Sequence, residues 1–113
     1  MEKVSLGYDR IRVLVLAVVH RGRVVTRQFV RQTLLGLADK SASYTIKSEL
    51  ITRALEDLSD EILIETFAGS EGRQRPFGLT RAARDELAHS LREHQAVTEI
   101  LRAIHDTVGP QAA

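Results

Sequence analysis

The chain has 113 residues, of which 43% are hydrophobic and 27% are charged, an ordinary composition for one globular domain. It has no cysteine, which excludes disulfides, thiolate metal ligands and cysteine nucleophiles. The longest apolar run, residues 11–19, contains Arg12 and is far shorter than the ~20 residues of a membrane helix. The start of the chain lacks the pattern of a signal peptide, so we expect a soluble, cytoplasmic protein that contacts no membrane.

The net charge of +1 hides an uneven distribution along the chain. Residues 1–37 carry seven basic and two acidic side chains, a net charge of +5, whereas residues 38–68 carry three basic and seven acidic ones, a net charge of −4. Because phosphate binding responds to local potential, segregated charge predicts a basic face on a nearly neutral molecule.

The first predicted helix begins after Asp9, which can cap it, and runs to about His20, with Gly22 as the stop signal. Its valines would also suit a buried strand. The residues expected on its apolar face are Ile11, Leu14, Val15, Val18 and Val19.

A short extended piece, Val24 and Val25, leads into the second helix. Thr26 can cap this helix, which is predicted over residues 27–37. Its buried face is expected to hold Phe29, Val30, Leu34 and Leu37. The polar residues 38–44 then form a connection.

The third helix is predicted over residues 45–59. Its apolar residues recur at three and four positions, as in a helical core stripe: Ile46, Leu50, Ile51, Ala54, Leu55 and Leu58. The opposite face is polar and carries Lys47, Ser48, Thr52, Arg53 and Glu56.

The period then changes to that of a β-hairpin. Residues 62–67 (ILIETF) predict one strand, the segment AGSEGRQR a long basic loop, and residues 76–80 (PFGLT) the returning strand, with Pro76 at its first position. Thr80 can cap a last helix over residues 81–108, which Gly109-Pro110 ends. A near-heptad seam follows this helix: Ala83, Leu87, Leu91, His94, Val97, Leu101, Ile104 and Val108.

This element order predicts a mainly α fold with a small β-hairpin, a winged helix-turn-helix followed by a long C-terminal helix. Residues 1–80 would form the winged-helix domain, 81–108 a dimerisation helix and 109–113 a flexible tail. The stretches Leu58–Ile64, Gly72–Arg75 and Phe77–Ala83 resemble the recognition-helix, wing and post-wing phrases of PadR-like and MarR-like regulators.

Two departures accompany this resemblance. Ile62 stands where those families have Gly, and the connection between the second and third helices is longer than in most MarR-like proteins, nearer the PadR-like arrangement. The resemblance implies a dimeric transcriptional regulator that binds double-stranded DNA.

A helix of this kind fits the major groove, where polar side chains on its outer face meet base edges. The side chains expected to read bases are Tyr44, Thr45, Lys47, Ser48 and Thr52. The wing tip is expected to reach the backbone or minor groove through Arg73, Gln74 and Arg75. Arg27 and Arg31, one helical turn apart, are expected to hold phosphates and set the register.

The last helix is too long to bury its whole seam against so small a domain, so we expect it to pair two subunits. The residues expected in this interface are Leu87, Leu91, His94, Val97, Leu101 and Ile104. A symmetric dimer would then present two recognition helices to half-sites about one turn of DNA apart.

No motif of a nucleotide-binding loop, nucleophile elbow or metalloprotease occurs, so we expect neither an enzyme nor a cofactor. His89 and Glu93 have metal-ligand spacing on the last helix but lack a third ligand, so no metal is expected. Two alternatives stay open: an architectural or partition-type DNA binder with low sequence preference, and a winged-helix module that binds protein through the acidic stretch 57–65. A small-molecule effector is left open, because the pocket for one would be lined by ordinary apolar residues that form no motif.

Overall fold

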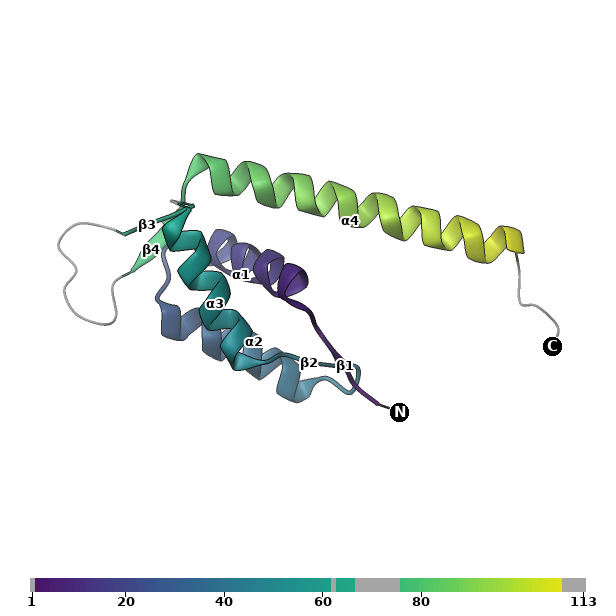
Figure 1. Cartoon of the computed structure of the whole chain (residues 1–113), viewed down its shortest axis with the longest axis horizontal. Helices are drawn as coiled ribbons and strands as arrows, with labels where there is room; N and C mark the ends of the chain where they lie inside the picture. The colour runs from purple at the N-terminus through teal and green to yellow at the C-terminus, as the bar shows by residue number, and fades with distance from the viewer. Residues whose placement is uncertain (1, 62, 67–75, 109–113) are drawn as a thin grey trace.

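The computed structural model describes residues 2–61, 63–66 and 76–108. Four helices and four short strands follow one another in the described part of the chain (Figure 1). In chain order they are β1 (Val4–Ser5), α1 (Tyr8–Gly22), α2 (Arg27–Lys40), β2 (Tyr44–Thr45), α3 (Ser48–Asp60), β3 (Ile64–Thr66), β4 (Phe77–Leu79) and α4 (Arg81–Val108).

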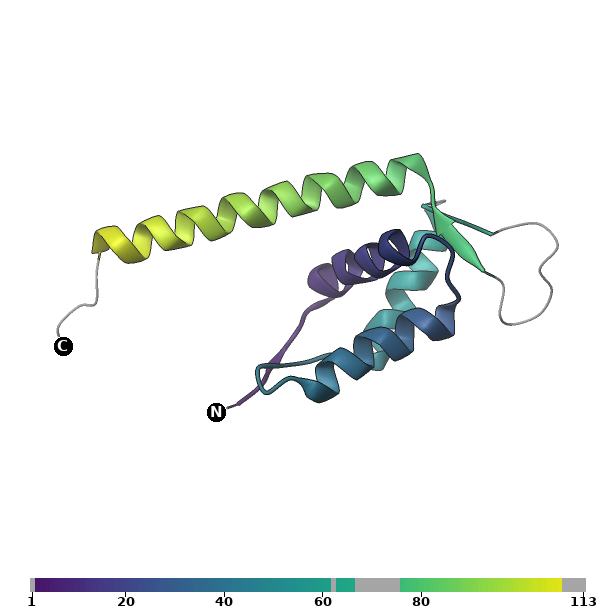
Figure 2. The ribbon, with the colours of Figure 1, turned by 180° about the vertical axis from the view of Figure 1, so that it is seen from behind.

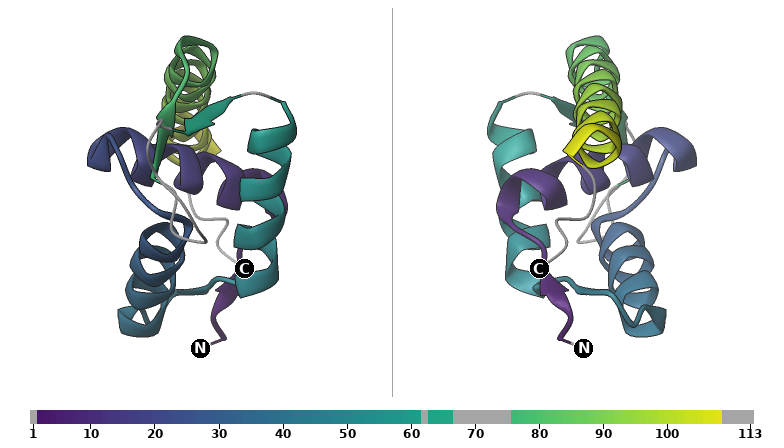
Figure 3. Two further views of the ribbon diagram at one scale, coloured as in Figure 1. Left: turned by 90° about the vertical axis from the view of Figure 1, so that its left-hand side faces the viewer. Right: turned by 90° about the vertical axis from the view of Figure 1, so that its right-hand side faces the viewer.

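Helix α1 is the centre of the fold and contacts α2, α3, β4 and α4. Viewed along the long axis, it crosses the space between the other three helices (Figure 3). Every described side chain that is fully buried in the core is apolar, so no desolvated charge opposes folding there. The core consists of Ile11, Val15, Leu16, Val19, Val25, Val30, Leu34, Ala38, Ile46, Ile51, Ala54, Leu55, Leu58, Phe77, Leu79, Ala83 and Leu87.

The first helix begins earlier than predicted. Its N-cap is Gly7, whose carbonyl accepts from the amide of Ile11 at 3.1 Å, and Asp9 lies within the first turn. The prediction of Asp9 as the cap was therefore wrong. Tyr8 explains the earlier start, because its hydroxyl donates to Asp57 of α3 and so holds the start of the helix against its neighbour.

The second helix is capped as predicted, with the amide of Phe29 donating to the Thr26 hydroxyl at 3.1 Å. It runs to Lys40, past the predicted end. Its buried row is Val30, Leu34 and Ala38. Phe29 and Leu37 were expected in the core but are 48% and 52% exposed, because they lie on the neighbouring row of the helix, one residue before the buried one.

The sequence pattern did not predict a parallel pairing of two short strands, which holds the start of the chain against the segment just before the third helix. Val4 pairs with Tyr44 and Ser5 with Thr45. Thr45 is therefore a strand residue, and α3 begins at Ser48 with Lys47 as its N-cap, which corrects the predicted helix start.

The wing is an antiparallel hairpin in which Ile64 pairs with Leu79. On the other edge of β4, Val25 forms a single-residue bridge to Phe77 through two backbone hydrogen bonds of 2.9 and 2.8 Å. The predicted hairpin is thus confirmed, and Val25 of the predicted extended piece pairs as expected, whereas Val24 lies in a bend. Residues 62 and 67–75 lie outside the described part of the chain.

Helix α4 spans Arg81–Val108 as predicted, and the Thr80 hydroxyl caps it by accepting from the amide of Ala83 at 3.3 Å. Its first turns bury Ala83 and Leu87 in the domain core. The helix then continues beside α1 and beyond it, as Figure 2 shows from behind. No helix within the described ranges combines the length and apolarity needed to cross a membrane.

Candidate nucleic-acid interface

A side-chain hydrogen bond joins the outer faces of α2 and α3. The guanidinium of Arg31 on α2 donates to the hydroxyl of Thr52 on α3. The same hydroxyl lies 3.4 Å from the Ser48 carbonyl, one turn earlier on α3. A predicted phosphate-binding residue and a predicted base-reading residue therefore occupy one continuous surface.

This surface contains an open hollow of about 650 Å3 lined by Arg31, Lys47, Ser48, Glu49 and Thr52. Four of these five residues are among those predicted to contact DNA. Glu49 was not predicted, and its carboxylate lies in the first turn of α3, where a negative charge is favoured by the helix dipole. Two cations face this single carboxylate, so the hollow has a net positive charge.

The other predicted contact residues divide into three groups. Arg27 is exposed at the first position of α2. Tyr44 is half-buried and Thr45 exposed, and both lie on β2, directly before α3 and not on it. The wing-tip residues Arg73, Gln74 and Arg75 fall outside the described residues.

Behind the interface, Arg12 of α1 joins the end of α3 to α4. Its guanidinium donates to Glu61 at 2.6 Å and to Glu86 at 3.0 Å, and its side chain is only 17% exposed. The hydrogen bonds to Glu86 and Glu61 raise the pKa of Arg12 above its usual high value. Because Glu61 caps the C-terminus of α3, this ion triad fixes α3 relative to α4.

A second contact fixes the middle of α3 to the start of α1. Asp57 accepts from the Tyr8 hydroxyl, and the guanidinium of Arg53 lies 4.8 Å from the centroid of the Tyr8 ring. Sequence reasoning missed both this contact and the Arg12 triad. The partners are 49 and 74 residues apart, and no periodicity within one element can pair residues at such separations.

The distal part of α4 presents an apolar row that nothing covers within the described chain. Leu91, Val97, Leu101 and Ile104, all predicted in the seam, are 46–61% exposed, and Ile100, which was not predicted, is 58% exposed.

The two remaining residues of the predicted dimer interface, Leu87 and His94, differ from this exposed row. Leu87 is 4% exposed and packs in the domain's own core. The exposed His94 ring has its Nδ1 atom 3.1 Å from the guanidinium of Arg10.

Three core helices, a hairpin directly after the third and a long closing helix define a winged helix-turn-helix domain with a C-terminal helical extension. No protein-family model matches the chain, and no curated protein matches it. Solved structures do share its fold. The protein smu.1704 from Streptococcus mutans is 20% identical, with 94% of each chain covered and a TM-score of 0.71.

Two further solved structures carry family names. A PadR family transcription regulator from Clostridium difficile is 18% identical, with 91% of this chain and 100% of that one covered and a TM-score of 0.65. A zinc-responsive MarR family member from Lactococcus lactis is also 18% identical, with 86% of this chain and 60% of that one covered and a TM-score of 0.56. These similarities confirm the winged-helix fold that the sequence resemblance implied.

Proposed function

We propose that this protein is a non-catalytic transcriptional regulator that binds specific sequences of double-stranded DNA. Helix α3 would enter the major groove with Lys47, Ser48 and Thr52 toward the bases, while Arg27 and Arg31 hold phosphates. The observation that carries the proposal is the hydrogen bond between Arg31 and Thr52. It keeps a phosphate-binding cation within reach of the base-reading face, so that one docking geometry serves both.

Two further observations support this function over a protein-binding module. The solved structures of this fold include regulators of the PadR and MarR families. Within the acidic stretch 57–65, Asp57 and Glu61 are engaged by Tyr8 and Arg12 of the same chain, which reduces the negative surface available to a basic partner.

DNA binding can be tested by selecting fragments from sheared genomic DNA with the purified protein, then measuring affinity for the recovered sequence by fluorescence anisotropy. A binder with several phosphate contacts should lose affinity steeply between about 50 and 200 mM salt. An architectural binder would recover no common sequence, and a protein-binding module would fail to bind duplex DNA even at low salt. Either result would contradict the proposal.

The roles of individual residues are separable. Arg27→Ala should weaken binding to all sequences alike and reduce the salt dependence, whereas Lys47→Ala or Ser48→Ala should change which sequence is preferred. Arg102→Ala is the matched control, because this exposed arginine lies on α4, away from α3. The wing-tip arginines Arg73 and Arg75 are predicted to behave like Arg27.

We further propose that two copies pair through the distal part of α4. An exposed row of large apolar side chains on one helix is the pattern of a surface that another helix covers. A two-fold dimer would present two α3 helices to a palindromic site with half-sites about 34–36 Å apart.

Sedimentation velocity at tens of micromolar protein tests the dimer. We expect the wild-type protein to sediment as a dimer and Leu101→Glu to sediment as a monomer, because a buried carboxylate without a partner opposes association. Leu37→Glu, at a similarly exposed leucine of α2, should leave the dimer intact. A wild-type monomer, or equal behaviour of the two variants, would contradict the proposal.

A further inference from the structure

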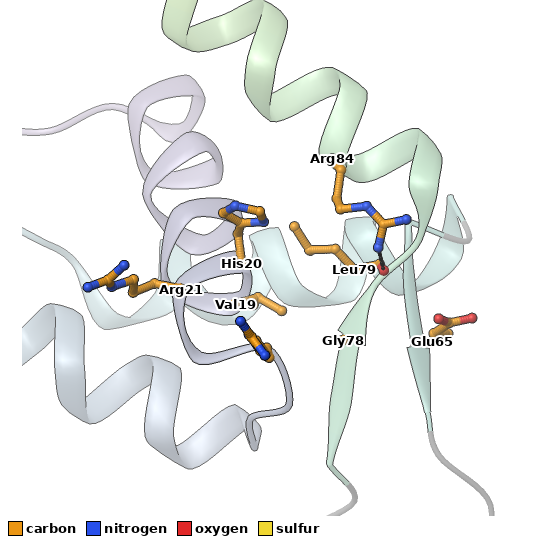
Figure 4. Close-up of a pocket in the computed structure, with 8 residues that line it drawn as sticks. Val19, His20, Arg21, Glu65, Gly78, Leu79 and Arg84 are labelled. Carbon is orange, nitrogen blue, oxygen red and sulfur yellow. Dashed lines mark hydrogen bonds between the residues drawn. The ribbon is translucent and has the colours of Figure 1, made fainter.

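A second basic hollow lies at the base of the wing, away from the α2–α3 surface. Its volume is about 490 Å3, and its walls come from the end of α1, the two wing strands and the first turn of α4. The basic residues around it are His20, Arg21, Arg23 and Arg84, and the remaining lining residues are Val19, Glu65, Gly78 and Leu79. Figure 4 shows His20 and Arg84 on either side of the Leu79 side chain, and the Arg21 side chain pointing away from Arg84.

The cations of this hollow have no carboxylate partner among the described residues. None of His20, Arg21 and Arg23 makes a side-chain hydrogen bond or ion pair there, and Arg84 donates only to the Leu79 carbonyl at 3.4 Å. A guanidinium has five N–H donors, so most of the donors of Arg84 remain open to a ligand.

The one carboxylate in the lining, Glu65, is poorly placed to neutralise these cations. It belongs to β3, and β4 lies between β3 and the strand residue Val25 that follows α1. Figure 4 shows its carboxylate on the far side of the hairpin from His20 and Arg21. The three arginines and one glutamate leave the hollow with a net positive charge.

The backbone around the hollow adds to this positive potential. Helix α4 begins beside it with Arg81 and Arg84 and has no acidic residue in its first turn, although the dipole at a helix N-terminus favours negative charge. Arg23 is the only described non-glycine residue with positive φ, at 66°, and forms a γ-turn closed by the Val24 amide and the Gly22 carbonyl at 2.8 Å.

We propose that this hollow is an oxyanion site that binds a phosphate group, held chiefly by Arg84 and Arg23. The planar guanidinium pairs with two phosphate oxygens at once. The group can come from a free phosphate compound or from a backbone phosphate of bound DNA, which is the same chemistry from two sources. The site itself does not depend on the proposed DNA-binding function.

The test is an NMR titration of the DNA-free protein with inorganic phosphate against sodium chloride at equal ionic strength. We expect saturable shifts of the backbone amides of Arg23, Gly78 and Arg84. Arg84→Gln should raise the phosphate dissociation constant about tenfold. Arg81→Gln is the matched control, since it removes a charge from the same helix turn but does not line the hollow, and should leave the constant nearly unchanged.

A second titration of the DNA-bound protein identifies the source. If DNA abolishes the phosphate shifts and Arg84→Gln weakens DNA binding, a backbone phosphate occupies the site. If the shifts persist, the ligand is a free phosphate compound. Shifts that do not saturate, or that are the same in Arg84→Gln as in the wild type, would overturn the site while leaving DNA binding through α3 unaffected.

Discussion

Replacing Gly22 by alanine should destabilise the fold, although alanine is the better helix former. A Cβ atom at this position would lie 2.4 Å from Cγ1 of Val25. Val25 cannot easily withdraw, because it is 6% exposed and its backbone is bonded to Phe77 in both directions. Overpacking of this kind costs about 1–3 kcal/mol, against at most about 0.5–1 kcal/mol gained from removing a helical glycine. We expect a net loss of about 1 kcal/mol.

Gly36→Ala is the control, because an added Cβ at Gly36 would meet nothing within 4 Å. This variant should gain about 0.5–1 kcal/mol. Urea unfolding followed by far-ultraviolet circular dichroism, at one protein concentration, measures both changes. With a urea slope of about 1–3 kcal/mol per M, the midpoint should fall by about 0.3–1 M for the variant at Gly22. Equal stability of the two variants would refute the close packing of Val25 against the end of α1.

Three further predictions follow from named contacts. Thr26→Ala removes the cap accepted from Phe29 and should lower the free energy of unfolding by about 1 kcal/mol in the same urea assay, with most of it restored in Thr26→Ser. Burial and, second, the hydrogen bond to Asp57 raise the pKa of Tyr8 above 10.0, so the protonated hydroxyl of Tyr8 stabilises the fold. This stabilisation is complete below pH 10 and is lost as the pH rises through the raised pKa. Tyr8→Phe should therefore lose less stability over that range, and equal losses would contradict the assignment. Arg12→Gln breaks the triad and should cost about 1–2 kcal/mol, a difference that should shrink in high salt because its carboxylate partners are partly exposed.

Local signals were enough to predict most of the fold. Thr26 and Thr80 precede apolar periodic segments and cap α2 and α4 as predicted. The change from helical to alternating period located the hairpin. The stripe of α3 predicted its buried residues Ile51, Ala54 and Leu58. In each case one element carries the whole signal, so neighbours in sequence are sufficient to detect it.

The errors occurred where distant segments decide the outcome. Threonine is common at the start of a helix, but Thr45 is held in an extended conformation by its pairing with Ser5. Phe29 is large and apolar yet lies outside the core, because the packing direction of α2 is set by helices α1 and α3. For the candidate interface, the polar face of the third helix predicted Lys47, Ser48 and Thr52, which the structure places around one hollow. The contact of Thr52 with Arg31 could not be predicted, because it depends on how two helices cross.

The pairing of β1 with β2 has a practical consequence for fusion proteins. The backbone at Val4–Ser5 is held against Tyr44–Thr45, which is followed closely by α3, and Figure 1 shows the N-terminal end of the chain beside this pair of strands. An affinity tag joined ahead of Val4 would emerge beside the helix we expect in the groove, where a polyhistidine or basic tag would contribute its own attraction to phosphates. Purification for binding measurements should therefore use an N-terminal tag that is cleaved off.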